Sequence, residues 1–197
     1  MTFMTDFPKG IVAFLVTSNI HKFNEASHVL SRYKIATAML KKIDAVEIQD
    51  DNIENVAKAS AVDAVQKCNL PIIVEDAGLS IKALKDFPGP YSSYVYRTIG
   101  NDGILKLMEN VAERYAYFKS VVAFLGPAMG SPMCFLGEVE GEIVKATRGS
   151  HGFGFDPIFK PFDSSKTFAE MTVEEKNQYS HRASAFLKFA EWYRANL

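Results

Sequence analysis

An uninterrupted apolar run near the N-terminus, IVAFLV from Ile11 to Val16, constrains the fold more than any other feature of the sequence. It lacks polar–apolar alternation and is rich in β-branched residues, which is typical of a strand buried on both faces. Three residue types that commonly begin helices follow it, and an apolar stripe at helical spacing then continues to Tyr33. A strand that leads directly into a helix predicts a layered α/β fold.

The rest of the chain predicts a mixed sheet. A second amphipathic helix over about residues 52–66 precedes PIIVEDAGLSI, which we interpret as a short apolar strand that ends in two acids and a glycine turn. Segment 86–96 predicts a loop and a short helix, and residues 100–108 predict a helix capped by Asn101 or Asp102. Residues 116–125 and 133–144 predict an antiparallel hairpin, and residues 180–196 predict the last helix. Strand–helix alternation followed by a hairpin predicts a mixed-sheet α/β protein.

Composition excludes several other classes of protein. A chain of 197 residues is expected to form one domain, and its net charge of −1 gives no overall positive field for nucleic acid. Cys68 and Cys134 lack the spacing of a zinc site or a disulfide framework. The N-terminal MTFMTDFPKG is unlike a signal peptide, and the IVAFLV run is far shorter than the roughly 20 residues of a membrane span. We therefore expect a cytoplasmic protein that binds neither nucleic acid nor membrane.

The segment TSNIHK, residues 17–22, is the first candidate site. A strand that ends in hydroxyl and amide residues just before a helix leaves free backbone N–H groups at the positive end of the helix dipole. Lys22 lies one turn into the helix, where its ammonium is able to reach the same anion. An ordinary helix cap with a solvated lysine gives the same pattern, so both interpretations stay open. P-loop and Rossmann sites are excluded, because neither glycine motif is present.

The adjacent acids Glu75 and Asp76 are the second candidate. They directly follow a buried strand, where open α/β sheets place their ligand crevices. Successive strand residues point to opposite faces, so we expect only one of the two acids to face the crevice. A carboxylate there suits Mg²⁺, which takes oxygen ligands and bridges substrate phosphates. The alternative is a turn acid that caps nearby amides.

Two later segments complete the set. GFGFDP places Phe153 and Phe155 among glycines. Aromatic side chains in such a loop can stack on nucleotide bases. The alternative is a glycine-rich loop that its two phenylalanine rings hold against the core. In EKNQYSHR, Ser180 is the expected cap of the last helix, which puts His181 and Arg182 in its first turn. Cations in the first turn interact unfavourably with the helix dipole, and an electron-rich ligand would compensate for this. The alternative is that these are ordinary surface residues, since arginines also occur in first turns. Together the four segments describe a nucleotide site.

The segments TSNIHK, KIDAVEIQ, VEDAGL, FPGPY, FGFDP and EKNQYSHR resemble, in order and approximate spacing, those of the inosine triphosphate pyrophosphatase family. The resemblance extends over about residues 11–187. It implies a single elongated domain over residues 1–197, with a central mixed sheet flanked by helices and two lobes that enclose the active-site cleft. It also implies a homodimer, in which the apolar loop of residues 88–96 is a candidate contact.

The activity that the resemblance implies is Mg²⁺-dependent hydrolysis of purine nucleoside triphosphates with non-standard bases: inosine, deoxyinosine and xanthosine triphosphate (ITP, dITP and XTP). The enzyme would cut between the α and β phosphates and release the monophosphate and pyrophosphate. Glu47 and Asp76 would bind Mg²⁺, and Asp76 would also accept the proton of the attacking water. Lys58 and Lys176 would neutralise phosphate charge or steady the sugar. The other substrate contacts that it implies are Thr17, Ser18, Asn19, Lys22, Ala77, Phe153, Gly154, Phe155, Asp156, His181 and Arg182.

If His181 and Arg182 both donate hydrogen bonds, the site should select these purines over adenine. Their 6-keto group accepts hydrogen bonds, whereas the 6-amino group of adenine donates them. One departure from the family pattern is that Ser92, Ser93 and Tyr94 follow FPGPY, where some relatives carry a basic residue. Arg97 lies four residues beyond Ser93, so we assign no basic contact in this loop.

Two other functions stay open. One is a regulatory module that binds a nucleotide without cleaving it, against which the carboxylates Glu47 and Asp76 argue. The other is an enzyme of related fold that acts on modified pyrimidine triphosphates, against which FGFD and SHR argue.

Overall fold

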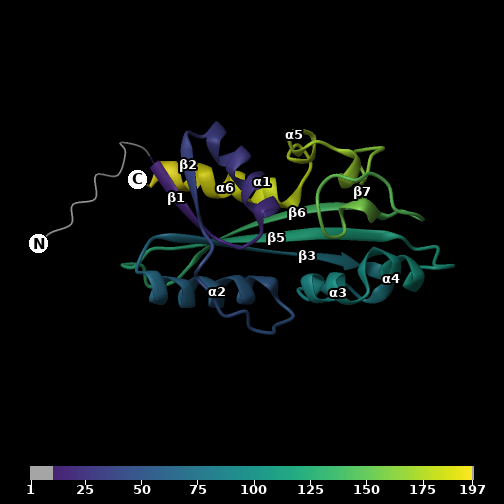
Figure 1. Ribbon diagram of the computed structural model, residues 1–197, viewed down its shortest axis with the longest axis horizontal. Helices are drawn as coiled ribbons and strands as arrows, with labels where there is room; N and C mark the ends of the chain where they lie inside the picture. Colours follow the sequence, from purple (N-terminus) through teal and green to yellow (C-terminus); the bar gives the residue numbers. More distant parts are fainter. Residues whose placement is uncertain (1–10, 197) are drawn as a thin grey trace, which may run out of the picture.

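The computed structural model describes residues 11–196, and the prediction about residues 1–10 lies outside this range. One mixed sheet runs through the described chain, with helices on both faces (Figure 1). Its strands are β1 (Ile11–Val16), β2 (Ile35–Leu40), β3 (Ile72–Ile81), β4 (Phe87–Gly89), β5 (Tyr115–Leu125), β6 (Met133–Ile143) and β7 (Phe159–Pro161). The helices are α1 (Ile20–Arg32), α2 (Ile53–Cys68), α3 (Ser92–Thr98), α4 (Gly100–Leu107), α5 (Val173–Lys176) and α6 (His181–Ala195). Three single 3₁₀ turns are η1 (Lys82–Leu84), η2 (Asp156–Ile158) and η3 (Phe168–Glu170).

The strand order is β2-β1-β3-β5-β6-β7, with β4 paired to β3. β1 runs parallel to both β2 and β3, whereas β3, β5, β6 and β7 pair antiparallel in succession. The predicted mixed sheet and the β5–β6 hairpin are therefore confirmed. Helix α2 packs on β3 and β5 on one face of the sheet. Helix α6 packs on β5 and β6 on the other face, and α1 packs against α6 (Figure 1). No helix of residues 11–196 is long and apolar enough to span a membrane.

The apolar core divides along the length of the sheet. At one end, the residues around Ile73 and Phe124 pack against α1 and α6 on one face, and Ile72 and Ala123 pack against α2 on the other. At the other end, Leu79, Ile81 and Phe118 pack with α3, α4 and the η2–η3 segment. The molecule therefore has two lobes that share the long strands β3 and β5.

The prediction for the segment PIIVEDAGLSI is wrong in one respect. β3 does not end at Glu75 and Asp76 but continues through them to Ile81, because β5 pairs with it along its whole length from Ile72. Gly78 forms no turn. A Cβ there would lie 2.3 Å from the carbonyl oxygen of Gly89, so the glycine permits the close approach of β4.

The predicted cap of α4 is also wrong. Ile99 is the N-cap of this helix and has no side-chain cap bond, because α3 ends only one residue earlier. Asn101 instead donates a hydrogen bond from Nδ2 to the carbonyl oxygen of Gly154, at 3.2 Å. The contact joins α4 to the glycine-rich loop.

Candidate active site

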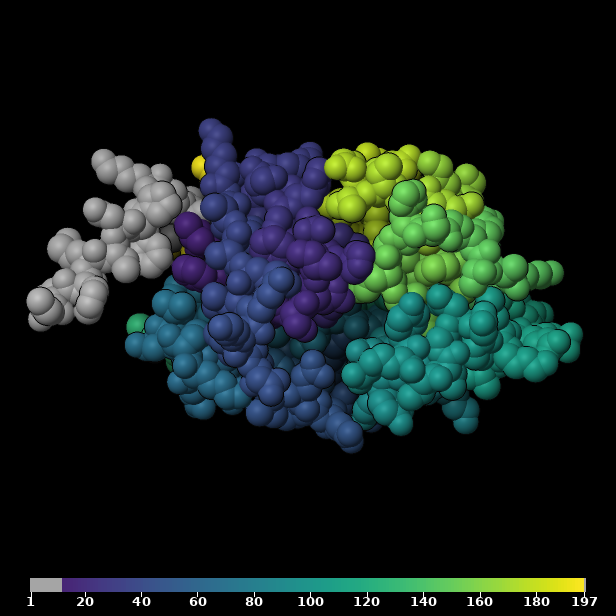
Figure 2. Space-filling view, in the orientation of Figure 1, coloured from purple at the N-terminus to yellow at the C-terminus, as the bar shows by residue number. Residues whose placement is uncertain are grey.

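A cleft of about 780 Å³ opens between the two lobes. In Figure 2 the surface is hollowed between the N-terminal segments, in purple and blue, and the teal and green segments of the other lobe. The sequence-predicted residues that line it are Thr17, Ser18, Asn19, Lys22, Glu47, Asp76, Ala77, Phe153, Gly154, Phe155, Asp156, His181 and Arg182. The structure therefore brings together residues from five separate segments of the chain.

The cleft opens where one edge of β3 lacks a neighbouring strand. β1 pairs with β3 only at Ile72 and Ile73, and β4 pairs with it only from Leu79 onward. Between these points no strand of the described chain pairs with residues 74–78 on this edge. Lys22 approaches here, and its Nζ donates to the carbonyl oxygen of Glu75 at 3.0 Å. The free strand edge thus gives the site access to the backbone and side chains of β3.

Glu75 points away from the cleft into a buried ion-pair network. Its carboxylate accepts a hydrogen bond from Ser120 Oγ at 2.6 Å and pairs with Lys22 Nζ at 3.1 Å and Arg182 Nε at 3.0 Å. Burial alone raises the pKa of Glu75, but Arg182 and Lys22 outweigh it and hold this pKa well below the usual value. Glu75 is therefore ionised, and its charge is balanced by Lys22 and Arg182 of the protein itself.

Asp76, the next residue, faces the cleft instead. Its Oδ2 is buried and has no hydrogen-bond partner among the described residues. Burial raises the pKa of Asp76 to about 6, with Glu75 and Glu47 adding to the rise and Lys22 opposing it. The expectation that the two adjacent acids diverge is confirmed.

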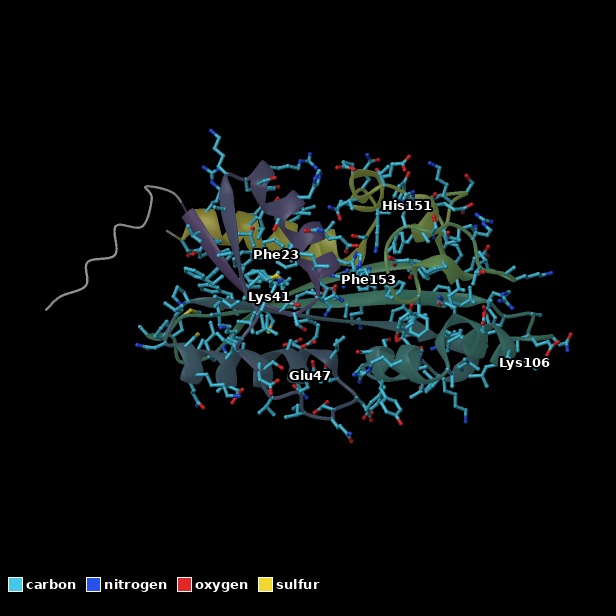
Figure 3. The ribbon with its side chains drawn as sticks, viewed as in Figure 1. Phe23, Lys41, Glu47, Lys106, His151 and Phe153 are labelled. Carbon is cyan, nitrogen blue, oxygen red and sulfur yellow. The ribbon has the colours of Figure 1, made fainter. Side chains whose placement is uncertain are left out.

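Glu47 reaches the same cleft from the loop between β2 and α2, and Figure 3 places it beside α2. The loop is held on α2 next to Glu47, because Val46 N–H donates to Asp63 Oδ2 at 2.9 Å and Ser60 Oγ donates to the carbonyl oxygen of Val46 at 2.9 Å. Among the described residues no group of three or more His, Cys, Asp or Glu side chains is arranged to hold a metal.

Two carboxylates with an unpaired buried oxygen nevertheless fit Mg²⁺. This ion is usually held by one or two protein carboxylates and takes its other oxygens from water and substrate phosphates. A cation at this position would also offset the repulsion that raises the pKa of Asp76. Glu47 and Asp76 are the candidate ligands.

The floor of the site contains a residue that sequence reasoning missed, Glu25 of α1. It is 3% exposed, and its carboxylate accepts hydrogen bonds from Lys176 Nζ at 2.7 Å and Arg182 Nη1 at 2.5 Å. Burial raises the pKa of Glu25, but Arg182 and Lys176 lower it below the ordinary value. Its helical spacing from Lys22 was the available signal, since residues three apart lie on the same face of a helix.

Lys176 is buried in this network rather than free to meet substrate. Its Nζ bonds Glu25 and, at 2.6 Å, Asp156, and it is absent from the cleft lining. This position does not support the predicted role of Lys176 in neutralising phosphate charge or steadying the sugar, which stays a prediction. The ion pair with Asp156 instead fixes the glycine-rich loop, because Asp156 Oδ2 also accepts the N–H of Phe153 at 2.9 Å.

Lys58 does not reach the cleft. Its ammonium pairs with Glu54 at 2.6 Å, one turn back on α2, and its side chain is 42% exposed. The structure gives no support to the predicted phosphate contact at Lys58, because helix geometry directs this side chain toward solvent and toward Glu54.

The two phenylalanines of the glycine-rich loop differ. Phe155 is 3% exposed and packs in the core, with Tyr96 edge-on at 5.5 Å between ring centroids. Phe153 lies near the start of α1 (Figure 3), where the ring of His21 stacks on it at 5.3 Å. Gly152 has a positive φ of +72°, and a Cβ there would lie 2.1 Å from Asp156 Oδ2. The loop is thus pinned by Phe155, and Phe153 is the better candidate for stacking on a base.

His181 and Arg182 occupy the first turn of α6, and Ser180 caps that helix as expected. Burial, followed by Arg182 and Lys176, holds the pKa of His181 well below its ordinary value, so the imidazole is neutral. The imidazole stacks on the ring of Phe118, with 4.6 Å between the ring centroids. Its buried Nδ1 has no hydrogen-bond partner among the described residues. The neutral ring donates from only one nitrogen. Arg182 stays charged between Glu25 and Glu75, which offset the unfavourable helix dipole.

One basic residue that was left unassigned also lines the cleft. Arg97 of α3 lies in the wall, together with Ser93 one turn earlier. The sequence reasoning therefore missed a basic residue of the cleft wall. The i,i+4 spacing of Ser93 and Arg97 was the signal, because such residues share a helix face.

Comparison with known proteins agrees with this arrangement. The model of the Ham1 family matches residues 13–192. The chain is 48% identical to the dITP/XTP pyrophosphatase of Methanopyrus kandleri over 92% of this chain and 95% of that protein. It is also 48% identical to the dITP/XTP pyrophosphatase of Pyrococcus horikoshii, over 93% and 97% respectively.

Solved structures give the same result. The Ham1 protein of Staphylococcus aureus superposes with a TM-score of 0.79 at 27% identity, covering 94% of this chain and all of that one. The HAM1 protein of Coxiella burnetii does so with a TM-score of 0.79 at 28% identity, covering 94% and 99%. The family model spans almost the whole described chain, and the chain belongs to the Ham1 family.

Proposed function

We propose that this protein hydrolyses ITP, dITP and XTP to the nucleoside monophosphate and pyrophosphate, and so clears these nucleotides from the nucleotide pool. The observation that carries the proposal is the cleft itself. An unpaired carboxylate and Lys22 lie at the free edge of β3, and an aromatic ring with buried polar donors lies beyond them. Relatives that are 48% identical over almost their full length are named dITP/XTP pyrophosphatases. We also propose that residues 1–197 form one catalytic domain.

In the proposed reaction, Asp76 accepts the proton of the attacking water. Its Oδ2 is buried at the cleft and has no hydrogen-bond partner among the described residues, which leaves this oxygen available to a water proton. Lys22 and the adjacent Thr17–Asn19 turn would hold the phosphates. Phosphoryl transfer depends chiefly on such positioning and charge stabilisation.

Magnesium is the proposed cofactor, with Glu47 and Asp76 as its protein ligands. When bound, it would neutralise phosphate charge and polarise the phosphoryl oxygens. The free thiols of Cys68 and Cys134 support a reducing, cytoplasmic location.

The purine would lie between Phe153 and the first turn of α6. Arg182 carries more N–H donors than its two carboxylates occupy, and neutral His181 donates from one ring nitrogen. Both would then face the 6-keto oxygen. Adenine would place its amino donor against these donors, and such a buried mismatch costs on the order of 10⁴ in selectivity.

The test is a panel of nucleoside triphosphates with Mg²⁺, in which pyrophosphate and single phosphate are measured separately. We expect pyrophosphate from ITP, dITP and XTP, and far slower release from ATP and from pyrimidine triphosphates. Release of single phosphates, a preference for a pyrimidine substrate, or tight binding of ITP without turnover over hours would each overturn the proposal.

We further propose a homodimer. The surface of β4, α3 and α4 supports it, because large apolar or aromatic side chains there are 38–64% exposed: Phe87, Tyr91, Tyr94, Tyr96, Ile99 and Leu107. Exposed apolar surface of this kind is typical of a protein contact.

A further inference from the structure

The charges that line the cleft do not match the charge of a triphosphate. The lining contains three permanent cations and four carboxylates: Lys22, Arg97 and Arg182 against Glu47, Asp50, Asp76 and Asp156. A nucleoside triphosphate brings about four negative charges. The site therefore needs cationic groups that are free to turn toward the phosphates.

Two of the three cations are already held by the protein. Lys22 pairs with Glu75 at 3.1 Å, and Arg182 pairs with Glu25 at 2.5 Å and with Glu75 at 3.0 Å. Each has its charge balanced by a buried carboxylate. The positive charge that they offer to a ligand is correspondingly reduced.

Arg97 differs from both. Its side chain is exposed, lines the cleft, and has no hydrogen bond or carboxylate partner among residues 11–196. A guanidinium is permanently charged and presents a planar fork of donors that matches phosphate oxygens. Among the lining cations of the described chain, Arg97 alone is free to pair with an added anion.

The backbone that carries Arg97 is firmly fixed. Ser92 Oγ, at the start of α3, accepts the N–H of Leu79 and donates to the carbonyl oxygen of Gly89, both at 2.8 Å. Val95 is buried in the core, and Tyr96 packs edge-on against Phe155 of the glycine-rich loop. A ligand would therefore have to order only the Arg97 side chain, not its helix.

We infer that Arg97 is a substrate-binding residue that contacts the phosphate groups of the nucleotide from the α3 wall of the cleft. The inference rests on the proposed function for its substrate class. Arg97 is assigned to the phosphates because they carry the negative charge of ITP, whose base and ribose are uncharged. Removal of a charge-assisted hydrogen bond typically weakens binding by about 10- to 100-fold.

The test is the binding of pyrophosphate, α,β-methylene ITP and inosine to the wild type and to Arg97→Gln by calorimetry with Mg²⁺. The methylene bridge of the ITP analogue prevents cleavage between its α and β phosphates. A matched control is Arg32→Gln, which removes the same charge from an exposed position in the last turn of α1, outside the cleft lining. In Arg97→Gln we expect pyrophosphate and the ITP analogue to bind about 10- to 100-fold more weakly, while inosine affinity and the urea midpoint stay unchanged. The control should bind all three ligands within about two-fold of the wild type.

Pyrophosphate affinity within about two-fold of the wild type in Arg97→Gln would overturn the inference, as would an equal loss of inosine affinity. Binding is measured without turnover, so a failure of the proposed hydrolysis is seen separately from a failure of the Arg97 contact.

Discussion

Two neighbouring acids in this molecule have opposite environments. Glu75 is paired with Lys22 and Arg182 and accepts a hydrogen bond from Ser120, whereas Asp76 lines the cleft and has no ion pair within the described chain. The period of two along a strand explains the divergence. It also means that changes at the two positions are expected to fail for different reasons. Loss of Glu75 would leave buried cations unpaired, while loss of Asp76 would leave the fold intact and remove a reactive group.

A first residue-scale prediction concerns the lysine that the structure excludes from the site. Lys58→Ala should keep turnover and the free energy of unfolding close to wild-type values, because a solvent-exposed i,i+4 ion pair contributes little to stability. Lys22→Ala is the comparison, and its kcat/KM should fall by at least about 10-fold. This substitution removes an ammonium that bonds the backbone of β3 and lines the cleft. The two variants are compared by steady-state kinetics and urea unfolding. A Lys58→Ala defect as large as that of Lys22→Ala would return Lys58 to the site.

A second prediction concerns pH and His181. The folded-state pKa of His181 lies well below 6.5, so the unfolded chain binds its proton first as the pH falls. The stability that this neutral histidine contributes is therefore complete above pH 6.5 and is lost as the pH drops below it. Asp76, whose pKa is raised to about 6, acts in the opposite direction over part of this range. The difference between the wild type and His181→Phe separates the two effects, because both proteins contain Asp76.

The measurement is the free energy of unfolding of both proteins between pH 7.5 and 5, from urea titrations. The wild type should lose stability relative to His181→Phe as the pH falls below 6.5, by up to about 1.4 kcal/mol per pH unit. Parallel curves would show that His181 is as easily protonated in the folded protein as in the unfolded one.

At the scale of elements, the sequence predicts long strands and helices well because their patterns are local. The strand at Ile11–Val16, the hairpin of β5 and β6 and the Ser180 cap of α6 follow from hydrophobic patterning and cap chemistry. The continuation of β3 through Gly78 did not follow, since it depends on pairing with β5, some 45 residues away in the chain. β2 also went unpredicted, because its short IATAML run resembles neither a clear alternation nor a buried strand. Long-range pairing decides both cases.

The same limit applies to the site. The motifs of the cleft could be found from the sequence because each lies next to a predicted element boundary. The burial of Lys176 between Glu25 and Asp156 could not, because Glu25 is about 150 residues away along the chain. Tertiary contacts alone distinguish a lysine that meets substrate from one that supports the floor of the site.

An element-scale prediction uses the contact between β3 and β4. Gly78→Ala should lower the free energy of unfolding by about 1–3 kcal/mol, because its Cβ would meet the carbonyl of Gly89 and push β4 away. Gly130→Ala is the matched control, since nothing lies within 4 Å of a Cβ there, and it should change stability by no more than about 0.5 kcal/mol. Urea midpoints of the two variants decide the matter. Equal midpoints would show that β4 adjusts without cost.

At the scale of the whole molecule, the two lobes share continuous strands and leave the cleft between them. The proposed dimer would bury the apolar surface of β4, α3 and α4. Light scattering at micromolar concentration should give a mass of about twice 21.9 kDa for the wild type. Leu107→Asp should shift this mass toward the monomer, whereas Val62→Asp, at a similarly exposed position on α2, should not. A wild-type mass of one chain would remove the dimer from this description.

The central role of Asp76 is tested most directly by one rate, the release of pyrophosphate from ITP at saturating Mg²⁺. Asp76→Asn should lower this rate by at least about 100-fold with an unchanged urea midpoint, because it removes the proposed proton acceptor and not a structural contact. Asp50→Asn changes another carboxylate of the cleft, one that accepts hydrogen bonds from Asn52 and Asn55, and should retain most of the rate. Wild-type turnover in Asp76→Asn would contradict the assignment of this carboxylate to the chemistry.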